Sequence, residues 1–175
     1  MDQSNFMCDV PDPIRIQLWK LFQTAEAAGR HLNGNAIRVN LVTSGPAGWN
    51  RGRIEIPLNP SDMGVIHHEV GHAYFEGSLF HTSKGGGRND WWGDAFCDAF
   101  RYCLEAQCSP SSNWMQQFPN EGAGGRYQYP ASLIVKKMPT KDLDGLKSIW
   151  DDLLARVDGT DDFLDREFDY QMPRP

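Results

Sequence analysis

Two histidines and a glutamate form the most informative pattern of this chain, His68-Glu69-Val70-Gly71-His72. In a helix, residues four apart project from the same face, so His68 and His72 can both present a ring nitrogen to one metal ion. Glu69 stands one position on, where its carboxylate can deprotonate a water molecule without closing the coordination of the metal. Zinc lowers the pKa of such a water to about 7. The pattern predicts one zinc ion per chain and hydrolysis with Glu69 as the general base.

A third protein ligand is expected, because catalytic zinc sites usually have three. The segment Gly93-Asp94-Ala95-Phe96-Cys97-Asp98 carries two carboxylates four residues apart. We expect Asp94 to bind the zinc, and Asp98 to accept the free N–H of a ligating histidine and so hold its tautomer. The pattern leaves two alternatives open, which are a capping acid for Asp94 and an ordinary surface acid for Asp98.

Three residues in predicted loops are candidates to stabilise the oxyanion of a tetrahedral intermediate, namely His81, Tyr127 and Tyr129. Each could donate a hydrogen bond to the developing negative charge. The alternative for each is an ordinary loop residue.

The elements that position these residues follow from the pattern of apolar side chains. Alternating apolar and polar residues predict strands over 36–42 and 52–58, and Pro57 indicates an edge strand because proline donates no ladder hydrogen bond. Capping residues at 59–62 predict the start of the helix that carries both histidines, with Gly77 as its C-terminal cap. Further helices are predicted over 13–32, 90–106, 131–137 and 141–157, with Thr140 capping the last and a long loop over 109–130.

The size and charge of the chain restrict the other classes of function. A length of 175 residues fits one domain, 1–175, built as an N-terminal lobe of about 1–77 and a C-terminal lobe of about 78–175 around a cleft. A formal net charge of -6 offers no basic face for a nucleic acid. No apolar run reaches the length of a membrane span, and the acids beyond Gly159 read as a solvated tail. The four cysteines favour free thiols, and a cytosolic location over secretion with a trimmed signal.

The order of these motifs resembles the gluzincins, the thermolysin-like branch of the zincin metallopeptidases. In that family a His-Glu-x-x-His helix precedes a second helix with Glu-x-x-x-Asp, and the resemblance covers roughly residues 37–105. Asp94 departs from the family pattern by being one methylene shorter than glutamate, so the second helix must approach more closely, which Gly93 would permit. The metzincin pattern does not fit, because Phe75 and Ser78 replace its glycine and its third histidine. The Gly-Thr-x-x-Asp signature of the aspzincins is absent as well.

The resemblance implies an α+β, zincin-like fold with a small twisted mixed sheet, an active-site helix and a mainly helical C-terminal part. It also implies a peptide or protein substrate that pairs with the strand over 53–58. Two other classes remain open, a zincin-fold binding or regulatory protein without turnover and a zinc hydrolase that does not cut peptides. The oligomeric state is open too.

Overall fold

The strands among the described residues are short. The computed structural model describes residues 6–8, 37–42, 48–49, 53–57, 64–75, 88–108, 111, 113–118, 127–160 and 162–172. Within them lie β1 (Phe6–Cys8), β2 (Ile37–Val42), β3 (Gly48–Trp49) and β4 (Arg53–Pro57). The pairs β1–β2 and β2–β4 are parallel and β3–β4 is antiparallel, which gives the order β1-β2-β4-β3. The strands predicted over 36–42 and 52–58 are therefore confirmed, whereas β1 and β3 were not predicted.

The prediction that Pro57 marks an edge strand is wrong, because β4 lies between β2 and β3. The physical reason is the shortness of β3, which pairs only with Ile54 and Glu55. Pro57 lies beyond that pairing, so its missing N–H leaves no bond to β3 unmade. The expectation that a substrate pairs along the free edge of this strand falls with the edge assignment.

Helices make up most of the described chain. They are α2 (Gly64–Phe75), α3 (Arg88–Cys108), α4 (Asn113–Gln117), α5 (Gln128–Lys137), α6 (Leu143–Arg156) and α7 (Phe163–Phe168). The predicted helices that carry the histidines and the aspartates appear as α2 and α3, and those over 131–137 and 141–157 as α5 and α6. Neither α4 nor α7 was predicted, and the helix expected over 13–32 lies outside the described residues.

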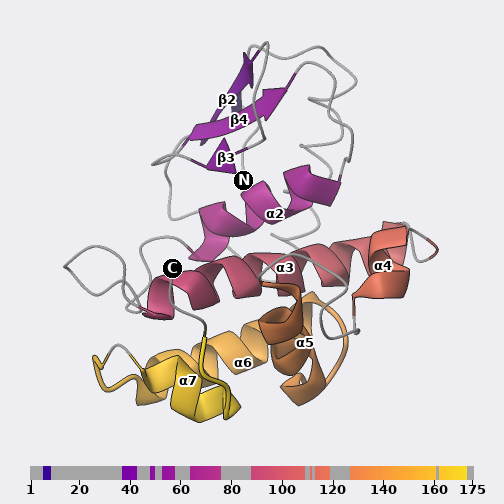
Figure 1. Cartoon of the computed structure of the whole chain (residues 1–175). Helices are drawn as coiled ribbons and strands as arrows, with labels where there is room; N and C mark the ends of the chain where they lie inside the picture. Colours follow the sequence, from indigo (N-terminus) through magenta and orange to yellow (C-terminus); the bar gives the residue numbers. More distant parts are fainter. Residues whose placement is uncertain are drawn as a thin grey trace.

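The core is built around α3, which contacts α2 on one side and α5, α6 and α7 on the other. Figure 1 shows α3 crossing the middle of the molecule, with α2 and the strands above it and α5 to α7 below. Trp92 and Phe96 of α3 are fully buried, as Phe100 is one turn further on. The ring of Trp92 stacks on Phe168 of α7 at 4.7 Å between centroids, and Phe96 meets Trp150 of α6 edge-on at 4.8 Å.

The expectation of an α+β, zincin-like fold with a twisted sheet is wrong, because the described residues are mostly helical. The strands contain three, six, two and five residues, so strand pairing is confined to short segments. Ile54 of β4 is buried, and the other described buried apolar side chains come mainly from α2, α3, α5, α6 and α7. Packing between helices, rather than a sheet face, therefore supplies the hydrophobic core of the described part.

Two expectations about the C-terminal third are also corrected. Asp142, not Thr140, caps α6, since its carboxylate accepts the backbone N–H of Gly145 at 2.9 Å. The tail beyond Gly159 is not merely a solvated acidic segment, because it forms α7 and buries Asp165 to 8% exposure.

No helix among the described residues is long and apolar enough to cross a membrane. The two-lobed domain with a cleft stays a prediction.

Candidate metal centre

The candidate site lies where α2 and α3 pack against each other. Near the end of α2, His72 faces Asp94, and one turn earlier His68 faces Asp98. At the start of α2, a side chain at Gly64 would meet Arg101 and Glu105. Contacts therefore move back along α2 as they advance along α3, so the two helices run antiparallel. The residues of α3 in this interface recur every three or four positions, which is one helical face.

Gly71 allows the close approach of the two helices. A Cβ atom at Gly71 would lie 3.0 Å from Cα and 3.1 Å from Cβ of Cys97. At Gly93, by contrast, an added Cβ would meet nothing within 4 Å. The expectation that Gly93 permits the approach is therefore wrong, because the contact falls on the other helix. Gly71, inside the histidine motif itself, brings the short side chain of Asp94 within reach.

One carboxylate oxygen lies between the two histidine rings. Oδ1 of Asp94 is 3.3 Å from Nε2 of His72 and 3.6 Å from Nε2 of His68. Zinc–nitrogen and zinc–oxygen bonds of about 2.0–2.2 Å in a tetrahedral site place ligand atoms about 3.3–3.6 Å apart. Both distances from Oδ1 of Asp94 fall in this range, so the chemistry and position of this carboxylate fit a zinc ion shared with either histidine.

Asp98 contacts the opposite nitrogen of the same imidazole. Its Oδ1 lies 2.7 Å from Nδ1 of His68, and the pair is largely buried. When Nδ1 carries the proton it donates to Asp98, which leaves the lone pair of Nε2 directed toward Asp94. The structure thus brings Asp98 to the place where an orienting partner of a metal-binding histidine is expected.

The electrostatics of the centre favour a cation. Burial lowers the pKa of His68, but its hydrogen bonds with Asp94 and Asp98 outweigh burial and raise the pKa to about 10. Burial also acts to raise the pKa of Asp94, yet the two histidines hold it well below its usual range. Without a metal, a proton on His68 supplies the positive charge between these carboxylates, and a bound metal ion would take its place.

Glu69 belongs to the same environment. Its side chain is buried, with 7% of the residue exposed, and burial raises the pKa of its carboxyl group despite the opposing charges of His68 and His72. A carboxylate with a raised pKa is a better proton acceptor than an exposed one.

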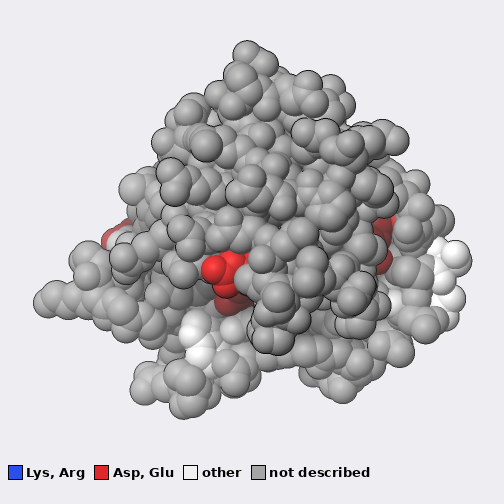
Figure 2. Space-filling model, turned by 90° about the horizontal axis from the view of Figure 1, so that it is seen from above, with Lys and Arg blue, Asp and Glu red and all other residues white. Residues whose placement is uncertain are grey.

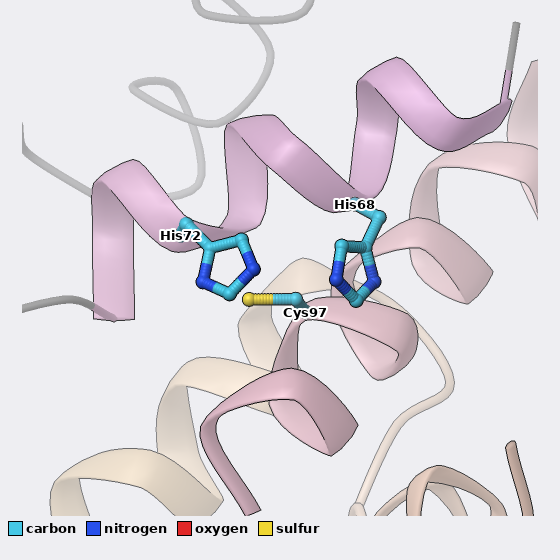
Figure 3. A group of neighbouring side chains, drawn as sticks. All are labelled: His68, His72 and Cys97. Atoms are coloured by element: carbon cyan, nitrogen blue, oxygen red, sulfur yellow. The ribbon is translucent and has the colours of Figure 1, made fainter. Parts of the chain in front are cut away.

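Cys97 is the residue of the site that was not assigned there from the sequence. One potential ligand atom from each of Cys97, His68 and His72 lies within 4.8 Å of the other two. Figure 3 shows the side chain of Cys97 below the histidines, with its sulfur atom directed toward the His72 imidazole. The available signal was its spacing, since Cys97 follows Asp94 by three positions and so shares its helical face.

Two of the three candidate oxyanion donors lie among the described residues. The ring of Tyr127 packs edge-on against Trp91 of α3, at 6.4 Å between centroids. Tyr129 packs against Tyr170 at 5.2 Å, on the C-terminal side of the molecule. His81 lies outside the described residues. Their proposed role stays a prediction.

On the face shown in Figure 2, acidic side chains reach the surface, and no Lys or Arg of the described part is visible.

Searches of protein-family models, of curated proteins and of solved structures found no match to this chain.

Proposed function

We propose that this protein is a zinc-dependent peptidase in which His68, His72 and Asp94 hold the metal and Glu69 is the general base. The observation that carries the proposal is the position of the Asp94 carboxylate, 3.3 Å and 3.6 Å from Nε2 of the two histidines. Residues four apart on one helix and a carboxylate from a second helix form a ligand set with one position left open. An open position distinguishes a catalytic zinc site from a structural one.

The chain's own residues supply the proton transfers. A zinc ion held there would polarise a scissile carbonyl and lower the pKa of a water molecule. Glu69 takes the proton of the attacking water and returns it to the leaving amine, which a single carboxylate can do in sequence. Asp98 holds the imidazole of His68 through Nδ1, so Nε2 is the nitrogen that would bind the metal after losing its proton.

The test separates metal binding from catalysis. In Glu69→Gln, cleavage of an unstructured protein such as casein should fall by about 10²–10⁴-fold, the usual contribution of a general base, while elemental analysis still finds one zinc per chain. Glu167→Gln, on α7, is the matched control and should keep full activity. Unchanged cleavage in Glu69→Gln would show that the role of this glutamate is wrong.

The same measurements address the ligands and the alternative classes. His68→Ala and Asp94→Ala should each lose zinc, since removing either leaves two protein ligands. Zinc retained in Asp94→Ala would move the third ligand elsewhere. Zinc bound by the parent without cleavage of any peptide would instead favour a binding or regulatory protein.

A further inference from the structure

Cys97 lies against the same two histidines as Asp94 does. Its ligand atom and those of His68 and His72 are mutually within 4.8 Å, and the residue is fully buried. In Figure 3 the sulfur lies below the imidazoles, on the side from which α3 approaches α2. The proposed zinc ligand set of His68, His72 and Asp94 does not use this sulfur.

The sulfur of Cys97 lies close to the backbone of α2 between the two histidines. A Cβ atom at Gly71 would lie 3.3 Å from Sγ of Cys97. Cys97 is also one turn from Asp94 on the same face of α3. A carboxylate and a thiol, one helical turn apart on α3, therefore both lie near the histidine pair.

A thiol and a carboxylate select different metal ions. Zinc accepts both thiolate and carboxylate ligands, whereas Cd²⁺ is a softer ion and favours the soft thiolate more strongly. Binding requires the thiolate, so the S–H bond of Cys97 breaks, its proton leaves to solvent and the sulfur electron pair forms the bond to the metal. Two nitrogens and a sulfur form a ligand set suited to Cd²⁺.

We propose that Cys97 gives the histidine pair a second, sulfur-containing mode of metal binding, through which thiophilic ions such as Cd²⁺ displace zinc and inhibit the protein. The inhibitory part rests on the proposed peptidase function, because it assumes that the same histidines hold the working zinc. The binding part rests only on the cluster of His68, His72 and Cys97.

The experiment titrates the metal-free protein with Cd²⁺ and follows the ultraviolet sulfur-to-metal charge-transfer absorption. Cys8 and Cys108 are first replaced by serine throughout, so that the sulfur can come only from Cys97 or Cys103. Cys103→Ala is the matched control, because Cys103 is equally buried on α3 and is not part of the histidine cluster.

The background protein and its Cys103→Ala variant should show the absorption at one equivalent of Cd²⁺. Cys97→Ala and Cys97→Ser should both lose it and bind Cd²⁺ at least about tenfold more weakly, because loss of an outer partner alone costs 10–100-fold. Two substitutions of different size guard against a packing effect at this buried position. Absorption that persists in both Cys97 variants, or that disappears in Cys103→Ala, would overturn the proposal.

Failure of this inference is distinguishable from failure of the peptidase function. If zinc binds and Glu69-dependent cleavage occurs but Cd²⁺ gives no Cys97-dependent absorption, only the sulfur-containing mode is wrong. If the absorption depends on Cys97 while Glu69→Gln leaves cleavage unchanged, the sulfur-containing mode of metal binding is supported and the catalytic role of Glu69 is wrong. With an active protein, Cd²⁺ inhibition should weaken in Cys97→Ala by the same factor as Cd²⁺ affinity.

Discussion

At the scale of single residues, the candidate metal centre depends on a contact to the ring nitrogen of His68 that is opposite the proposed metal position. Asp98 binds Nδ1 of His68 at 2.7 Å, and the same ring points Nε2 toward Asp94. A histidine whose tautomer is held by a carboxylate binds a metal ion without first reorganising. The centre is therefore expected to respond to changes in residues that do not touch the metal.

Replacing Asp98 by alanine should weaken zinc binding by about 10–100-fold, because His68 loses the partner that orients it. Competition with a chelator of known affinity measures the change. Asp151→Ala, which alters an exposed acid of α6, is the control and should leave zinc affinity unchanged. An Asp98→Ala protein with the affinity of the parent would show that the contact is only structural.

A second prediction at this scale concerns Asp165, the buried acid of α7. Its carboxylate accepts the indole N–H of Trp92 at 2.8 Å and the backbone N–H of Met172 at 3.3 Å. Asp165→Ala leaves these buried donors without their acceptor, at a cost of about 1–3 kcal/mol in the free energy of unfolding. Urea denaturation at neutral pH measures it. The exposed pair of Lys147 and Asp151 provides the contrast, since Asp151→Ala should cost well under 1 kcal/mol.

At the scale of elements, the distance between α2 and α3 decides whether Asp94 reaches the histidines. That distance is set by Gly71, where the backbone of α2 meets the backbone of α3 at Cys97. A backbone contact yields less easily than the end of a flexible side chain.

Gly71→Ala should therefore lower both the stability of the protein and its zinc affinity, even though alanine favours a helix by about 1 kcal/mol over glycine. The new methyl group pushes α3 away and moves Asp94 from the histidine pair. Gly93→Ala is the matched control, since its Cβ would meet nothing within 4 Å and it should stabilise α3. Denaturation curves should show lower stability for Gly71→Ala and higher stability for Gly93→Ala, and zinc titrations should show weaker binding for Gly71→Ala. Equal effects of the two substitutions would contradict the close contact at Gly71.

The start of α6 gives a prediction with a pH dependence. Hydrogen bonds from Thr140 and from the backbone of Gly145 lower the pKa of Asp142 below its usual value. A carboxyl group whose pKa falls on folding stabilises the protein above its unfolded-state pKa, and this stabilisation disappears as the pH falls through the folded-state pKa. Asp142→Ala should cost about 1 kcal/mol at pH 7, the usual value of an N-cap.

The difference between the parent and Asp142→Ala should narrow as the pH drops below about 4, where the carboxyl group becomes protonated. Thermal unfolding over a series of buffers measures this trend. Ser148→Ala, at an exposed position within α6, should show no comparable dependence on pH. A constant difference down to pH 2 would contradict the role of the charged cap.

At the scale of the whole molecule, α3 connects the proposed chemistry to the core. One face of α3 carries Asp94, Cys97 and Asp98 toward α2, while the opposite face buries Trp92 and Phe96 against α6 and α7. Buried aromatic contacts on one face therefore hold the proposed ligands on the other.

The local patterns of the chain determined much of this arrangement. Periodic apolar residues predicted α3 and α6, because the 3.6-residue repeat of a helix is visible in the sequence, and capping residues predicted the helix that contains α2. Residues four apart likewise singled out His68 with His72, and Asp94 with Asp98. Short helices such as α4 and α7 carry too few turns to show a period, and their formation depends on packing against α3.

Only the tertiary structure decided which residues of different helices meet. The sequence by itself determined the faces of α2 and α3, but not the offset between them, which depends on how closely the backbone of α2 at Gly71 approaches Cys97 of α3. Because of that contact, Gly71 rather than Gly93 is the glycine that permits the close approach of the helices, and the sulfur of Cys97 lies near the histidines. Only the structure could show this, because packing between helices is a long-range interaction that no spacing along the chain records.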